Sequence, residues 1–133
     1  MKTLMISAVL WALGLCLTSA ADKKGGEEFD KRVNEVNAVA QQPAKMDLVL
    51  QRISTETGVP VERLKQQHQK NPNVGLGGLF VANLMADETK KSPENFVAQK
   101  AAGKKWVTIA KEHNVSLDKI NDRLERLEKA IKG

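Results

Sequence analysis

Apolar residues recur every three or four positions along most of the chain, which is the spacing of one face of an α-helix. Two such stripes come first: Phe29, Val33, Val36 and Ala40, followed by Met46, Val49, Leu50 and Ile53. Pro43 is expected to separate the two helices, and Gly58 to end the second one in a left-handed conformation. No stretch alternates apolar and polar residues for long enough to predict a β-strand. The pattern therefore predicts an all-α protein.

Turn and cap residues divide the rest of the chain into further short helices. Pro60 can open one helix, which ends near Asn71 because the residue before a proline avoids helical angles. Gly75, Gly77 and Gly78 then predict a tight turn or a close backbone crossing. Three sets of apolar residues predict three later helices: Leu79, Phe80, Leu84 and Met85; Phe96, Val97 and Ala101; and Trp106, Ile109 and Ala110.

The last predicted helix has the most regular pattern, and Ser116 is placed to cap it. Its apolar stripe consists of Leu117, Ile120, Leu124, Leu127 and Ile131. The stripe is shorter than the three or four heptads that a coiled coil needs, so we expect it to pack onto its own domain, with a dimer seam as the alternative. The predicted fold is a compact orthogonal bundle of about six or seven short helices. It forms one domain over 29–133 after a flexible lead-in over 22–28.

The first 21 residues have the three-part layout of a secretory signal peptide. Lys2 supplies a cationic start, residues 4–17 are uncharged and almost wholly apolar, and cleavage is expected after Ala20 or Ala21. The apolar run is short for a membrane span, which needs about 20 residues. The alternatives are an uncleaved anchor and lipidation at Cys16, whose surrounding sequence resembles a bacterial lipobox. We predict a secreted or periplasmic protein.

Composition narrows the possible chemistry. The 133-residue chain is 41% hydrophobic and 28% charged, which is typical of a folded soluble protein. Loss of the signal peptide leaves 20 basic and 16 acidic residues, a net charge of +4, and no cysteine. Disulfides and multi-cysteine metal sites are therefore excluded from the mature chain. Aromatic residues make up 4% with no tyrosine, so a platform for stacking sugars or bases is hard to build.

Two segments of the chain have similar sequences and predict similar helix corners. Ile53 to Leu64 aligns with Ile109 to Ile120, and each has a Gly or Asn turn, a valine, a cap residue and a second helix. The turn requires a residue that tolerates positive φ, and the valine fills the corner. Duplication and convergence on a stable helix corner both explain this likeness.

The segment from Ile109 to Ile120 resembles the helix-turn-helix of bacterial DNA-binding proteins. With Gly103 to Trp106 upstream, it also resembles the helical half of lysin-motif (LysM) modules, which bind N-acetylglucosamine polymers in cell walls. The stretch from Gly75 to Val115 is similar to small secreted bacterial all-helical proteins of uncharacterised function. The first two resemblances imply nucleic-acid binding and wall-glycan binding, and the third implies no particular chemistry.

These resemblances define a candidate binding surface: Trp106, Arg63, Lys65, Gln66, Gln67 and Lys70. The basic and amide side chains lie on the second helix of the first corner, where they suit phosphates or base edges. The second corner instead offers Asp118 and Asp122, which repel phosphate, so nucleic acid is disfavoured as a partner. Trp106 is the mature chain's only tryptophan, and we expect it in the core rather than at a ligand platform.

No catalytic or metal-binding constellation is visible in the sequence. His68 is expected on a solvated face, and His113 at a helix end, where a positive charge suits the helix dipole. Their spacing brings neither histidine beside a hydroxyl and an acid. Glu112 and His113 are adjacent and therefore diverge on a helix, which does not make a metal-binding pair.

The sequence thus predicts a non-catalytic secreted or periplasmic helical module that binds a protein or cell-envelope partner. It predicts no cofactor, no membrane span after signal cleavage, and a mostly monomeric chain. A LysM-like cell-wall glycan binder is the first alternative, and a nucleic-acid-binding helix-turn-helix protein is the second.

Overall fold

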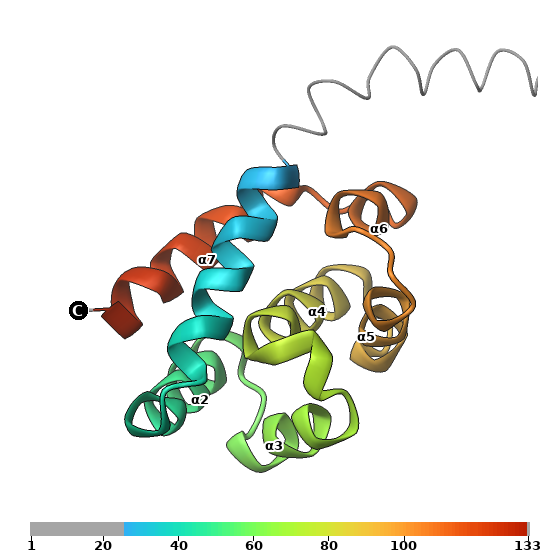
Figure 1. Ribbon diagram of the computed structural model, residues 1–133. Helices are drawn as coiled ribbons and strands as arrows, with labels where there is room; N and C mark the ends of the chain where they lie inside the picture. The colour runs from blue at the N-terminus through green and yellow to red at the C-terminus, as the bar shows by residue number, and fades with distance from the viewer. Residues whose placement is uncertain (1–25, 133) are drawn as a thin grey trace, which may run out of the picture.

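The computed structural model describes residues 26–132. The predicted signal peptide, its cleavage positions Ala20 and Ala21, Cys16 and residues 22–25 of the predicted lead-in lie outside this range. Residues 26–40 are helical, and the following elements come next (Figure 1): α2 (Pro43–Thr57), α3 (Val61–Lys70), the 3₁₀ helix η1 (Pro72–Val74), α4 (Gly75–Thr89), α5 (Pro93–Ala101), α6 (Trp106–Glu112) and α7 (Leu117–Lys132). No strand occurs within 26–132, and the predicted all-α fold class is confirmed.

Helix α4 is the central element of the bundle and packs against α2, α3, α5 and α7 (Figure 1). Every residue from Leu76 to Ala86 is buried, because neighbouring helices cover this segment on all sides. Such a helix needs no polar face, which explains why its sequence is almost wholly apolar. The buried apolar side chains from Phe29 to Ile131 join into a single core cluster.

The glycine run near the start of α4 lets two helices approach closely. Gly75 has a φ of 75° and marks the turn from η1 into α4, whereas Gly77 and Gly78 lie inside the helix. A Cβ on Gly77 would lie 2.5 Å from the carbonyl oxygen of Val33, and the Gly77 N–H donates to Asn37 Oδ1 at 2.7 Å. The predicted close crossing is therefore confirmed, and the turn is confined to the first glycine.

Both predicted helix corners contain a left-handed residue at the expected position. Gly58 has a φ of 77° and Asn114 a φ of 56°. Helix α3 begins three residues after Gly58, and α7 begins three residues after Asn114. Val59 and Val115 are partly buried against the core in the two corners. The internal repeat and the family resemblances themselves stay predictions.

Residues 26–28, which the sequence assigns to a flexible lead-in, are helical in the structure. Gly26 is buried and faces Val107 of α6, where an added Cβ would lie 3.1 Å from Val107 Cγ1. A charged, glycine-containing sequence suggested flexibility there, but the contact with α6 overrides this local preference.

Helix α7 packs its apolar stripe against its own domain, as predicted. Ile120, Leu124, Leu127 and Ile131 are each at most 2% exposed, so this stripe is not free to form a dimer seam. Ion pairs add to the contact with two other helices: Arg32–Glu128 (3.3 Å), Glu35–Lys132 (3.2 Å), Glu56–Arg123 (3.7 Å) and Glu56–Arg126 (3.9 Å).

Candidate functional site

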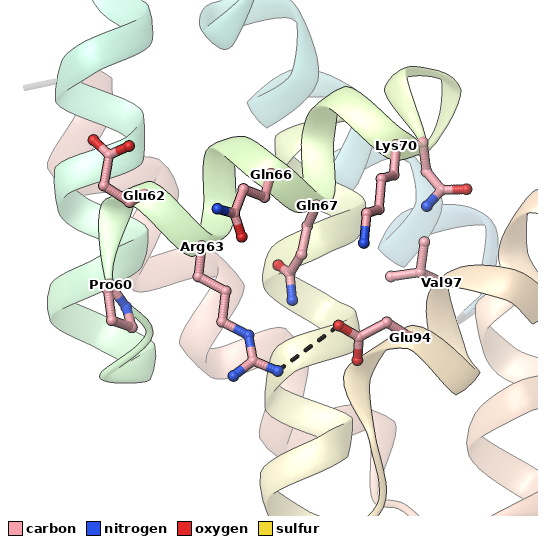
Figure 2. Close-up of a pocket in the computed structure, with 9 residues that line it drawn as sticks. Pro60, Glu62, Arg63, Gln66, Gln67, Lys70, Glu94 and Val97 are labelled. Carbon is pink, nitrogen blue, oxygen red and sulfur yellow. Dashed lines mark ion pairs between the residues drawn. The ribbon is translucent and has the colours of Figure 1, made fainter.

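A cleft of about 480 Å³ lies between α3 and the start of α5 (Figure 2). Its lining is mostly polar and comes from the two helices and the turns beside them: Pro60, Glu62, Arg63, Gln66, Gln67, Lys70, Asn71, Glu94 and Val97. Four of the six residues of the predicted binding surface belong to this cleft. The structure therefore brings the predicted α3 residues together with residues of α5.

An ion pair spans the cleft between its two walls. Figure 2 shows Arg63 extending from α3 toward Glu94, and the Arg63 Nη2 to Glu94 Oε1 distance is 3.7 Å. The two side chains are 54% and 56% exposed, so water screens the pair. Exposed pairs of this kind contribute only about 0–1 kcal/mol, and a ligand can separate the two charges at little cost.

Glu94 is held as a carboxylate at the N-terminus of α5. Ser92 occupies the N-cap position of this helix without a capping hydrogen bond from its side chain, and Pro93 opens the helix, so Glu94 lies in the first turn. The Ser92 hydroxyl donates to Glu94 Oε2 at 2.6 Å and lowers the pKa of Glu94, as does the residue's own backbone N–H. Arg63 and Lys70 across the cleft lower this pKa further. The cleft thus presents fixed charges of both signs.

Gln67 forms the floor of the cleft and is not the solvent-facing residue that the sequence suggested. It is 6% exposed, and its side-chain amide exchanges two hydrogen bonds with Asn83 of α4, at 3.0 and 3.4 Å. Asn83 also donates to the Leu79 carbonyl at 2.8 Å. Buried amides need such partners, so this pair satisfies the polar groups at the floor.

Two residues of the predicted surface do not line the cleft. Lys65 lies outside it, with its Nζ 3.8 Å from Glu62 Oε1. Trp106 is 0% exposed, which is incompatible with a surface role and agrees with the expected core position. The tryptophan ring lies beside Gly78 of α4, and the Lys100 ammonium lies 5.5 Å from the ring centroid.

The α5 wall of the cleft was not predicted as part of any site. Ser92-Pro93-Glu94 carries a clear helix-start signal, but that signal says nothing about which helix α5 faces. Val97 belongs to the apolar set that predicted this helix, and it is 3% exposed. Pairing of α3 with α5 depends on tertiary packing around α4 and has no local sequence signature.

His113 lies outside the cleft, at the end of α6 in the corner that leads to α7. Its ring packs edge-on against Phe96, with 4.9 Å between the ring centroids. Lys91 Nζ lies 3.0 Å from Nδ1, and the side-chain amide of Gln99 lies 3.2 Å from Nε2. Burial lowers the pKa of His113, and Lys91 and Lys104 lower it further, against a smaller opposing effect of Glu112.

His113 lies at a helix end, as predicted, directly after α6. Burial first, and the neighbouring lysines second, lower its pKa and disfavour the cationic form there. The Lys91 ammonium and the Gln99 amide nitrogen both donate, and a neutral imidazole ring accepts at only one of its two nitrogens. His68 of α3 is half-buried rather than fully solvated, and its Nδ1 has no hydrogen-bond partner in the described part of the chain.

Acidification through the His113 transition is expected to weaken the fold. The unfolded chain takes up this proton near the ordinary pKa of 6.5, whereas the folded chain takes it up only at lower pH. The free energy of unfolding should therefore fall as the pH drops from above 6.5 toward the pKa of the folded state. Urea titrations at a series of pH values across this range measure the effect. In His113→Gln, the free energy of unfolding should depend less on pH over the same range.

An NMR titration of the His113 ring provides the control. Lys91→Gln removes one facing cation and should move the pKa of His113 back toward its ordinary value. A pKa at or above 6.5 in the unaltered protein would contradict this interpretation.

Within residues 26–132 there is no group of three or more His, Cys, Asp or Glu side chains that could hold a metal ion. In that same range no helix is both long enough and apolar enough to cross a membrane. Comparisons with known protein families, with curated proteins and with solved structures give no match for this chain.

Proposed function

We propose that this protein is an exported, non-catalytic helical module that binds a mixed-charge segment of a partner protein in the α3–α5 cleft. The supporting observation is the exposed Arg63–Glu94 pair across the cleft, with a separation of 3.7 Å. Each charge can exchange its present partner for an opposite charge on a ligand. Exposed rim pairs of this kind influence the choice of partner more than affinity.

The rest of the lining favours a polypeptide over other ligands. Gln66 and Asn71 offer amides that can pair with a peptide backbone, and Val97 and Pro60 supply small apolar contacts. No aromatic side chain lines the cleft, so a wall glycan would lack a stacking platform. Glu62 and Glu94 are part of the same lining and would repel the phosphates of nucleic acid.

Selection from a displayed library of random peptides against the exported chain tests this proposal. Enriched peptides should carry both an acidic and a basic residue. Their Kd should rise at least tenfold, about 1.4 kcal/mol, when Arg63→Glu or Glu94→Lys places a like charge against the ligand. The double swap Arg63→Glu/Glu94→Arg restores the ion pair but reverses its polarity, so it should not restore the original affinity.

Lys65→Gln is the matched control, since it removes a charge from the same helix outside the cleft. Selected peptides that bind all of these variants equally would refute the cleft as the site. Retention on insoluble peptidoglycan that is lost in Glu94→Lys would instead indicate a glycan ligand. A salt-sensitive shift with DNA would indicate nucleic acid.

A further inference from the structure

The positive charge of the folded chain is concentrated in one segment. Residues 26–132 hold 18 basic and 15 acidic residues. The segment 90–111 alone holds six lysines and one glutamate, which gives it a net charge of +5. All other residues of this range hold 12 basic and 14 acidic side chains, a net charge of −2. The segment runs from the end of α4 through α5 and α6.

We call four of these lysines the lysine surface: Lys91, which precedes α5, Lys100 near the end of α5, and Lys104 and Lys105 in the α5–α6 connection. Lys91 contacts His113, and Lys104 lies beside the same corner through its 2.7 Å ion pair with Glu112. Lys100 lies over Trp106, and Lys100 and Lys105 both lie close enough to Asp30 to lower its pKa. The connecting residues 102–105 are all exposed.

Little acidic charge offsets this surface. Within the described range, Lys91, Lys100 and Lys105 form no ion pair with a carboxylate, and only Lys104 does, with Glu112. Asp30 is the nearby carboxyl group, and Lys100 and Lys105 both lower its pKa against the larger opposing effect of burial. Glu94, the one acid of the segment, is paired with Arg63 of α3. The lysine charges are therefore available to an external partner.

The choice of lysine indicates the kind of partner. All six cations of the segment are lysines, and every arginine of residues 26–132 lies elsewhere. Arginine suits bidentate recognition of a single carboxylate or phosphate, whereas lysine acts as a mobile point charge. We propose that the lysine surface docks this protein peripherally onto membranes that contain anionic phospholipids. This proposal is independent of the α3–α5 cleft, since none of the four lysines lines it.

Sedimentation with vesicles tests the proposal on the exported chain. The protein should bind vesicles of mixed phosphatidylcholine and phosphatidylglycerol and dissociate from them at high salt. It should not bind vesicles of phosphatidylcholine alone. Each lysine near an anionic surface contributes about fivefold in partitioning. The triple variant Lys91→Gln/Lys100→Gln/Lys105→Gln should therefore bind about 100-fold more weakly.

A second triple variant, Lys31→Gln/Lys65→Gln/Lys119→Gln, removes the same net charge from other exposed positions and should bind almost normally. Circular dichroism melts confirm that both triples fold. Equal losses in both would overturn the proposal, since net charge alone would then explain binding. Binding to phosphatidylcholine alone, or to soluble polyglutamate but not to vesicles, would overturn it as well. Arg63→Glu should retain vesicle binding, which separates this test from that of the cleft.

Discussion

Replacing Trp106 by alanine is expected to lower the free energy of unfolding by about 3 to 5 kcal/mol. Trp106 is 0% exposed and ranks among the largest fully buried side chains of the described chain. Its removal leaves a cavity beside α4, because a helix that is itself buried all round cannot move in to fill the space. Urea unfolding followed by circular dichroism measures the change.

Trp106→Phe provides the control for this prediction. Phenylalanine keeps an aromatic ring in the cavity, and the indole N–H that it lacks has no hydrogen-bond partner within the described chain. We expect a smaller cost, about 1 to 2 kcal/mol. If Trp106→Ala changed the stability by less than 1 kcal/mol, the residue could not be the centre of a packed core. If Trp106→Ala lost binding to a glycan, the loss would be due to unfolding, because the buried tryptophan cannot contact a sugar directly.

Replacing Gly77 by alanine is expected to lower the free energy of unfolding by about 3 kcal/mol. The new Cβ would lie 2.5 Å from the Val33 carbonyl oxygen, which belongs to backbone and cannot rotate away. The two helices must separate, and the 2.7 Å hydrogen bond from Gly77 N–H to Asn37 Oδ1 weakens as they do. Helix propensity alone predicts the opposite sign, a gain of about 1 kcal/mol.

Gly58→Ala is the matched control at a glycine that makes no close approach. An added Cβ there meets nothing within 4 Å, so only its positive φ of 77° opposes the substitution. The expected cost is about 1 to 2 kcal/mol, less than at Gly77. Thermal melts of the two variants side by side give the comparison. Stabilisation by Gly77→Ala would mean that the helices do not cross at this point.

Local features of this fold were predictable from the sequence because short-range physics determines them. Gly58 and Asn114 tolerate positive φ, and both end their helices in the left-handed conformation. The 3–4 spacing in the last helix predicted which side would be buried, and Ile120 to Ile131 follow it. Trp106 is buried, as expected for a large aromatic side chain, although two lysines precede it in the sequence.

The candidate site was only half predictable, because its geometry depends on contacts between distant residues. Gly77 meets Asn37, which is 40 residues earlier, and Gln67 meets Asn83, which is 16 residues later on another helix. Helical periodicity gives no information on such pairings. A single asparagine in the apolar run of α4 was the available signal for a buried amide pair, since a polar residue there needs a partner.

The amide pair between Gln67 and Asn83 has a consequence for how the cleft can evolve. Exchanging rim residues such as Arg63, Gln66 or Glu94 changes stability by about 0.5 kcal/mol or less, as is usual for exposed positions. Replacing either amide alone leaves the other one buried without a hydrogen-bond partner, which lowers the free energy of unfolding by about 1 to 3 kcal/mol. Descendants of this chain can therefore acquire new specificities through single changes at the rim, whereas a new floor requires two simultaneous changes.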